Sequence, residues 1–277
     1  MATGLLLALA LWLGLHLWAP AAERAARRIW APLLREGEAI SVVLATTPQL
    51  WVREFGDLPL PVEDPPMHFV PPDAEAFRDW FLRMTGQKPR RLILHPNNHS
   101  PLGGEANAAI LFASFAAERG TRVELLLGEN TGATEIRDRQ AVVLGRPEYS
   151  RAAAALQPAK GYTVRYVPER RAVGVVLPNG TGYFREEKGK TNYGLVTMLT
   201  RQTSAGARAT MLVSGINSDG SEAAMSFMTT VVNLETLEQE FLRAHGRIPR
   251  NYQVVVRSRS SDTRSLHSQR AAILTLD

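Results

Sequence analysis

The sequence predicts an α/β fold: a three-layer sandwich around a mostly parallel, Rossmann-like sheet, with antiparallel additions in the second half. Three observations support this fold class. Apolar runs rich in β-branched residues, at residues 39–45 and 140–145, have the composition of strands covered on both faces. A long helical stretch at residues 105–119 lies between them, as in the strand–helix–strand units of parallel sheets. After Gly161 the runs follow one another through short turns, as in antiparallel hairpins.

The central strands are predicted from short apolar runs that are bounded by turn residues. They are residues 39–45, 91–94, 122–127, 140–144 and 209–213. We expect Val43, Leu125, Val143 and Leu212, one in each of four of these runs, to be buried. The helix at residues 105–119 should pack across these strands, because a crossover helix covers the sheet that it connects.

A proline-rich segment, residues 46–72, separates the first two predicted strands. Proline fixes φ and removes a backbone donor, so we expect an irregular surface segment here. Asp73 is then predicted to cap an amphipathic helix at residues 74–85. Two shorter helical segments are expected at residues 135–139 and 150–156.

The second half of the chain begins with a predicted hairpin, residues 162–177, which turns at Pro168-Glu169-Arg170-Arg171. Asn179-Gly180 marks another tight turn. Three further strands are expected, at residues 191–201, 252–257 and 271–276. Two late helices should begin at the capping residues Ser221 and Asn233.

Composition excludes several classes of protein. The chain has 277 residues, of which 45% are hydrophobic, so it is long enough and apolar enough for a sizeable core. It has no cysteine, which excludes disulfides, thiol catalysis and cysteine-ligated zinc. The net charge of +5 is spread along the chain without a dense basic block, so no nucleic-acid partner is expected.

The N-terminal segment from Gly4 to Ala22 is apolar except for His16, and it is just long enough to cross a bilayer as a helix. A cleaved signal peptide and a buried helix are the alternatives. No Lys or Arg precedes the segment, and Pro20 lies close to the small residues that a peptidase would cut after. We therefore expect a retained single-pass anchor that holds the protein in the lipid bilayer.

The predicted organisation is an anchor and stalk at residues 1–28, followed by a single α/β domain at residues 29–277. Arg24, Arg27 and Arg28 follow the predicted span, and the positive-inside rule would put that side in the cytoplasm. This rule is weak for one short span. We expect an inner-membrane protein of a bacterium whose soluble domain is extracytoplasmic.

The candidate site is the strand–loop–helix at residues 211–230, where a short polar loop follows a buried strand. In open α/β sheets, such loops gather at the carboxyl edge of the strands, where ligands bind. The free N–H groups at the predicted helix start also favour an anionic or strongly polar group. A second polar loop, after residues 91–94, should share that edge. The predicted ligand-binding residues are Asn97, Asn98, His99, Ser214, Gly215, Asn217, Ser218, Asp219 and Ser221.

Catalytic and metal alternatives fit the sequence less well. The loop after residue 213 has neither the G-x-S-x-G spacing of a hydrolase elbow nor the lysine of a P-loop. His95 and His99, with Asp219 or Glu222, have the side chains of a metal site. Pro96 argues for a loop, however, where residues four apart do not share a face. We therefore predict no catalytic residues, no metal and no cofactor.

Four short segments together resemble a known group of proteins: residues 29–34, 101–106, 141–145 and 214–224. The resemblance is to the extracytoplasmic α/β domain of uncharacterised bacterial single-pass membrane proteins, which often sits behind a DNA-binding module. The chain differs in beginning almost at the apolar segment, and in having Glu105 and Ser221 where the relatives usually have Asp and Thr. The resemblance implies a membrane-attached sensory or ligand-binding role, and it supplies no catalytic residues.

Two functional hypotheses therefore follow. The first is a non-catalytic extracytoplasmic domain that binds a small polar or anionic ligand or a partner protein. The second is an α/β hydrolase or transferase that uses the same strand-end loops. The sequence contains no acid/base pair with a legible spacing, which favours the first hypothesis.

Overall fold

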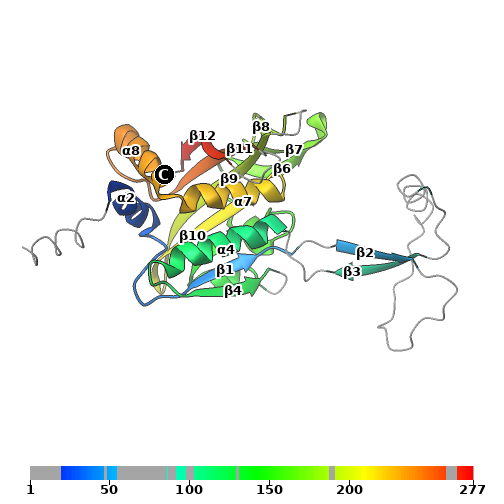
Figure 1. Ribbon diagram of the computed structural model, residues 1–277, viewed down its shortest axis with the longest axis horizontal. Coiled ribbons are helices and arrows are strands. Elements are labelled where there is room, and N and C mark those ends of the chain that lie inside the picture. Colours follow the sequence, from blue (N-terminus) through cyan, green and yellow to red (C-terminus); the bar gives the residue numbers. More distant parts are fainter. Residues whose placement is uncertain are drawn as a thin grey trace, which may run out of the picture. The chain divides into compact units, whose positions relative to one another are not determined.

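Apolar, β-branched segments from both halves of the chain join into one mixed sheet (Figure 1). The structure is a computed structural model, and it describes residues 20–46, 49–54, 86, 92–97, 103–128, 131–186, 191–259 and 267–276. Contacts divide the chain into two units, one of which is Thr46–Ser100. The other unit combines Met1–Ala45 with Pro101–Asp277 and contains the sheet.

The sheet has seven strands in the order β12-β11-β9-β10-β5-β1-β4. Their bounds are β1 (Ile40–Leu44), β4 (Val123–Leu127), β5 (Gln140–Leu144), β9 (Thr191–Thr203), β10 (Gly206–Gly215), β11 (Tyr252–Arg259) and β12 (His267–Thr275). The pairings of β4 with β1, β1 with β5 and β5 with β10 are parallel. Those of β10 with β9, β9 with β11 and β11 with β12 are antiparallel. The fold is thus α/β as predicted, with the antiparallel strands late in the chain, but its sheet is mixed rather than mostly parallel.

The register aligns the apolar positions of successive strands into rows across the sheet. In one row Val42 pairs with Val142, Val142 with Met211, Met211 with Met198, and Met198 with Tyr252. All five side chains are buried. A slip of one residue in any strand would turn its apolar set to the opposite face, so this burial specifies the pairing.

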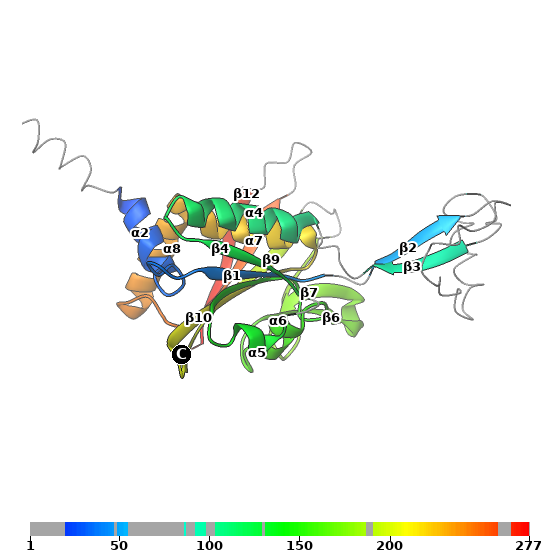
Figure 2. The same ribbon diagram turned by 90° about the horizontal axis from the view of Figure 1, so that it is seen from below.

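Four helices cover one face of the sheet, and α4 and α7 lie side by side on it (Figures 1 and 2). They are α2 (Ala21–Trp30), α4 (Gly103–Ala117), α7 (Ser218–Thr229) and α8 (Val231–His245). Phe112 and Phe115 of α4 belong to the largest buried cluster, which also contains Trp30 of α2. The helix predicted at residues 105–119 therefore packs across the strands as expected.

The opposite face carries shorter elements (Figure 2). They are α5 (Ala133–Ile136), α6 (Arg151–Leu156) and a three-stranded sheet of β6 (Thr163–Val167), β7 (Ala172–Val176) and β8 (Gly182–Phe184). The predicted hairpin is confirmed: β6 and β7 are antiparallel and are joined by the 3-10 turn η1 (Pro168–Arg170). Arg171 then adopts a left-handed conformation, with φ of 48°.

Helix α2 is an integral part of the core. The indole Nε1 of Trp30 donates a 2.9 Å hydrogen bond to the carbonyl of Met228, at the end of α7. Arg28 donates from Nε and from Nη2 to the two carboxylate oxygens of Glu238 on α8. The buried face of α2 begins at Ala25, upstream of the predicted domain start at residue 29. The segment predicted as a stalk therefore packs against α8.

The unit Thr46–Ser100 corrects two predictions. Residues 91–94 were expected in the central sheet, but β3 (Leu92–Asn97) pairs antiparallel with β2 (Gln49–Glu54) in a separate two-stranded sheet. Strand β2 also falls in the segment expected to be irregular, within the proline-free stretch that follows Pro48. The helix predicted at residues 74–85 lies outside the described residues.

Burial of the four chosen core residues is confirmed for three of them. Val43, Val143 and Leu212 are at most 2% exposed. Leu125 was also expected to be buried, but 59% of it is exposed. The reason is topological, because β4 is one of the two edge strands of the sheet. Composition alone does not distinguish an apolar edge strand from a central one.

In the described part of the chain, no helix has the length and apolar character needed to span a membrane. The predicted span lies almost entirely outside that part, which begins at residue 20. Helix α2 begins after Pro20, whose ψ of 150° is extended rather than helical.

Candidate functional site

The loop between β10 and α7 is built around a sharp turn. Asn217 caps α7, and its side-chain oxygen accepts a 3.0 Å hydrogen bond from the backbone N–H of Gly220. Ser221 was predicted to be the cap, but the helix begins three residues earlier, at Ser218. Gly215 permits this turn, since a β-carbon there would lie 2.3 Å from the carbonyl oxygen of Asn217.

The first turns of α4 and α7 meet beside this loop. The backbone N–H of Gly104 donates a 2.5 Å hydrogen bond to the hydroxyl of Ser218. The absence of a side chain at Gly104 makes this approach possible, because a β-carbon would lie 2.0 Å from the carbonyl oxygen of Ser218. Two helix starts, each carrying a partial positive charge, are therefore brought together.

A buried carboxylate occupies the junction of the two helices. Glu105 of α4 is 3% exposed. Its carboxylate accepts a 2.9 Å hydrogen bond from the hydroxyl of Ser221 and a 3.2 Å hydrogen bond from the hydroxyl of Ser218. A carboxylate is stabilised near helix N-termini, so Glu105 provides the negative charge that the two dipoles favour.

Asn192, at the start of β9, holds the other side of the loop. This residue is fully buried. Its side-chain oxygen accepts a 3.1 Å hydrogen bond from the amide of Asn217, and its amide donates a longer one, 3.4 Å, to Asp219. We call Glu105, Asn192, Asn217, Ser218, Asp219 and Ser221 the strand-end cluster. The sequence analysis did not identify Asn192 as a site residue. Its position was nevertheless a usable signal, because Asn192 is a polar residue at the start of β9, the strand that precedes β10 in the chain.

The neighbouring strand adds an unsatisfied polar group. Ser258 of β11 pairs with Asn192 in register, so both side chains point to the face covered by α7. Ser258 is fully buried, and its hydroxyl finds no hydrogen-bond partner in the described part of the chain. Such groups are uncommon in folded proteins.

The predicted site residues separate into three groups. Asn217, Ser218, Asp219 and Ser221 come together in the strand-end cluster. Ser214 and Gly215 are buried beneath them, and the Ser214 hydroxyl donates a 2.9 Å hydrogen bond to the carbonyl of Gly145. Asn97 ends β3 in the other unit, whereas Asn98 and His99 lie outside the described residues. Their approach to the loop stays a prediction.

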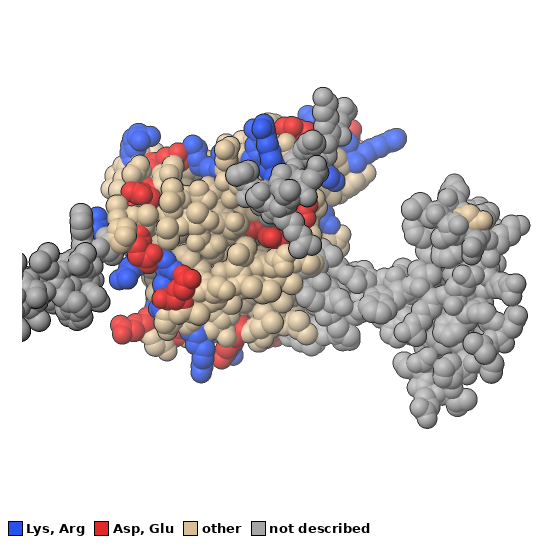
Figure 3. Space-filling view, in the orientation of Figure 1, with Lys and Arg blue, Asp and Glu red and all other residues tan. Residues whose placement is uncertain are grey.

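The accessible rim of the cluster is polar and acidic. Asp219 is exposed, and Asn217 and Ser218 are half-buried. Beside them, Glu222 of α7 accepts a 2.9 Å hydrogen bond from the side chain of the exposed Asn107 on α4. The surface over the middle of α4 and α7 carries few charges (Figure 3). Acidic groups therefore set the electrostatic character of this helix junction.

The geometry offers little for catalysis. Ser221 is fully buried, so its hydroxyl cannot reach a substrate. His245, at the end of α8, is hydrogen-bonded to Thr275 rather than to a serine of the cluster. Among the described residues there is no group of three or more His, Asp or Glu side chains arranged to hold a metal ion. The serine hydroxyls of the cluster are instead hydrogen-bonded to the carboxylate of Glu105.

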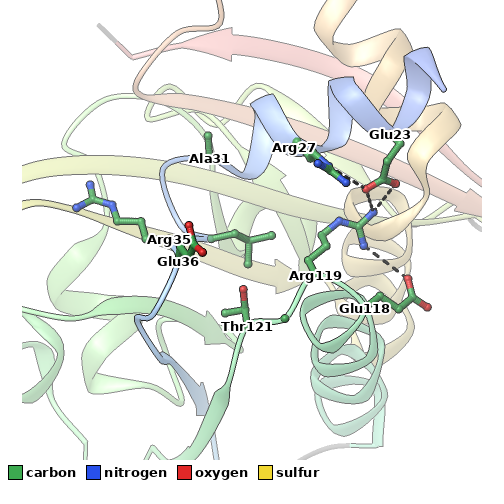
Figure 4. A pocket seen from close by; sticks show the side chains of 10 residues that line it. Glu23, Arg27, Ala31, Arg35, Glu36, Glu118, Arg119 and Thr121 are labelled. Atoms are coloured by element: carbon green, nitrogen blue, oxygen red, sulfur yellow. Dashed lines mark hydrogen bonds and ion pairs between the residues drawn. The ribbon is translucent and has the colours of Figure 1, made fainter. Parts of the chain in front are cut away.

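A second feature, which sequence reasoning missed, is a cavity of about 600 Å³ at the other end of α4 (Figure 4). It is lined by Glu23, Arg27, Ala31, Leu34, Arg35, Glu36, Glu118, Arg119, Gly120 and Thr121. Helix α4 has 15 residues, so the cavity and the strand-end cluster are separated by roughly 20 Å. No sequence signal marks this cavity, because its walls come from two segments far apart in the chain, residues 23–36 and 118–121.

The fold and the cluster define an α/β protein with a polar, acidic site where two helix starts meet at the carboxyl edge of parallel strands. Comparisons with protein-family models, with characterised proteins and with solved structures found no match for this chain.

Proposed function

We propose that this chain is a membrane-anchored α/β protein whose extracytoplasmic domain binds a small polar ligand at the strand-end cluster. The observation that supports this proposal is that buried polar side chains hold the accessible side chains of the strand-end cluster in place. Buried Glu105 and Asn192 hold Ser218, Asn217 and Asp219 through hydrogen bonds, and Asp219 remains open to solvent. Polar side chains that are positioned in advance lose less entropy when a ligand binds.

The chemistry of the rim favours a ligand that donates hydrogen bonds. Glu105, Asp219 and Glu222 are all acidic, and they already balance the positive ends of α4 and α7. An anion placed here would face two accessible carboxylates. We therefore favour a neutral or cationic polar ligand over the anionic one that the helix start alone suggests.

Binding is a better account than catalysis. The alternative from the sequence is a hydrolase or transferase that uses the same loops, and it would need an accessible nucleophile. The best-placed hydroxyl, that of Ser221, is buried against Glu105. No other observation favours an enzyme.

We also propose a fold type and a cellular location for this chain. We interpret the architecture as a Rossmann-like three-layer sandwich, on the grounds that α4 and α7 cover one face while α5, α6 and the small sheet lie on the other. The apolar segment from Gly4 to Ala22 and the docking of α2 directly after it support a single-pass anchor in a bacterial inner membrane. The resemblance to extracytoplasmic domains supports the orientation.

The test is ligand binding by the full chain in detergent, with three defined probes: a diamine (putrescine), a neutral sugar (glucose) and an anion (acetate). We expect the diamine or the sugar to bind, and Asp219→Ala to weaken that binding about tenfold, because a hydrogen bond to a charged group is lost. The melting temperature should hardly change, because Asp219 is exposed. Asn217→Ala is unsuitable, because it removes the cap of α7.

The matched control is Asp138→Ala, which removes an exposed carboxylate outside the cluster. It should leave binding unchanged. Preferential binding of acetate, or equal effects of the two substitutions, would contradict the proposal.

A further inference from the structure

The cavity beside α2 is lined by charges of both signs. Its charged residues are Glu23, Arg27, Arg35, Glu36, Glu118 and Arg119. Its volume of about 600 Å³ lies within the ordinary range of ligand pockets. Some of these charged side chains are paired within the protein, and others are available to a ligand.

Arg119 and Glu23 are paired with each other, and this contact stabilises the fold. The guanidinium of Arg119 lies 3.6 Å from the centre of the Phe115 ring and donates a 2.9 Å hydrogen bond to the Phe115 carbonyl. It also binds both carboxylate oxygens of Glu23, at 2.7 and 2.9 Å. With its side chain only 11% exposed, Arg119 joins α2 to the end of α4.

Arg27 and Glu36 remain for a ligand. The side chain of Arg27 is 69% exposed, and its contact with Glu23 is long, at 3.7 Å. Glu36 is exposed and makes no hydrogen bond or ion pair within the described part of the chain. Figure 4 shows Glu36 on one side of the cavity and Arg27 on the other, while the guanidinium of Arg35 points away from both. The cavity therefore offers a cation and an anion on facing walls.

A ligand that pairs with both Arg27 and Glu36 needs an anionic group and a cationic group a short distance apart. A phosphate suits the planar guanidinium of Arg27. A primary ammonium, which has N–H donors, suits the carboxylate of Glu36. The two groups occur together in phosphoethanolamine.

The position of the cavity indicates the source of this group. Glu23 is the first residue after the predicted span and Arg27 is four residues further on, a rise of about 6 Å along a helix. The polar layer on each side of a bilayer is roughly 5–8 Å thick. Because α2 follows the proposed span directly, an anchored chain would hold the cavity close to the lipid headgroups.

We propose that this cavity binds the headgroup of phosphatidylethanolamine, with the phosphate on Arg27 and the ammonium on Glu36. The proposal rests on the retained anchor of the proposed function. The lipid would then orient the domain on the membrane surface, independently of the strand-end cluster.

The test uses the full chain in nanodiscs of phosphatidylcholine doped with phosphatidylethanolamine or with phosphatidylglycerol, and native mass spectrometry counts the lipids retained. We expect selective retention of phosphatidylethanolamine. Arg27→Gln and Glu36→Gln should each weaken it about tenfold, because each removes one charged contact. Arg151→Gln, which changes an exposed arginine on α6, should have no effect. Unchanged melting temperatures will show that both variants fold.

Each of the following results would overturn the proposal or the anchor on which it rests. Equal retention of phosphatidylglycerol, or indifference to Glu36→Gln, would mean that the cavity recognises a phosphate alone. Binding of soluble phosphoethanolamine as tight as that of the lipid would make a free solute the ligand. Loss of lipid binding by a chain that remains in the membrane fraction overturns only the lipid site, whereas a chain found in the soluble fraction overturns the anchor.

Discussion

At the scale of single residues, Glu105 shows how one side chain connects two elements. Its carboxylate accepts hydrogen bonds from the hydroxyls of Ser218 and Ser221, both of which belong to the first turn of α7. Because Glu105 itself lies in the first turn of α4, it stabilises both helix starts at once. The same contacts give the accessible side chains of the strand-end cluster their positions.

We predict that Glu105→Ala lowers the free energy of unfolding by about 2 kcal/mol or more, because it leaves the buried hydroxyl of Ser221 without a partner. Urea denaturation of the full chain in detergent measures this. The control is Glu222→Ala, which removes a half-exposed carboxylate of the neighbouring helix α7 and should cost under about 0.5 kcal/mol. Similar losses for the two variants would contradict the role assigned to Glu105.

A second residue-scale prediction concerns pH. The carboxylate of Glu38 accepts hydrogen bonds of 2.8 and 2.9 Å from Arg208, and this contact holds the pKa of Glu38 below its usual value, outweighing the opposite effect of desolvation. A depressed folded-state pKa stabilises the protein above the unfolded-state pKa, about 4.3, and that stabilisation is lost as the pH falls through the folded-state pKa.

Melting curves between about pH 3 and pH 7 test this effect. The wild type should melt higher than Glu38→Gln at neutral pH, and the difference should shrink below about pH 4.3. Glu169→Gln, which changes an exposed carboxylate without a partner in the described chain, should show no such convergence. A constant difference for Glu38→Gln would exclude the linkage.

At the scale of elements, the sequence predicted which segments form strands better than it predicted where those strands lie in the sheet. The β-branched runs of β1, β5 and β10 became central strands, because such runs are stable only where both faces are covered. The apolar run in β3 looked the same but pairs with β2 instead. Partner choice is a non-local property, and single-segment composition does not contain it.

The candidate site was likewise predictable only where it depends on residues that are neighbours in the sequence. The polar loop after β10 was identified from its own residues, whereas the buried partners Glu105 and Asn192 come from α4 and β9. The cap of α7 was misplaced by four residues, at Ser221 instead of Asn217, because Asn217, Ser218 and Ser221 are all good capping types. Only the backbone geometry selects Asn217.

A matched pair of substitutions tests the sheet order. Val143 and Leu125 were both expected in the core, but only Val143 is buried. Val143→Asp should unfold the domain, because an unpaired buried carboxylate costs several kcal/mol out of a typical stability of about 5–15 kcal/mol. Leu125→Asp, on the edge strand, should cost under about 1 kcal/mol. Circular dichroism and urea denaturation distinguish the two, and equal effects would contradict the order β5-β1-β4.

At the scale of the whole molecule, two of the three arginines after the predicted span, Arg24 and Arg28, have structural partners. Arg28 is paired with Glu238 of α8, and Arg24 also has a partner. Their presence is therefore explained by the docking of α2, which weakens their use as a signal for a cytoplasmic orientation.

The central claim is an anchored domain on the extracytoplasmic side, and the absence of cysteine makes it directly measurable. Arg151→Cys places a single thiol at an exposed position at the start of α6. In intact bacteria, a membrane-impermeant maleimide should label this variant, and the labelled chain should stay in the membrane pellet after alkaline carbonate extraction. Labelling only after cell lysis, or a labelled chain in the soluble fraction, would contradict the claim.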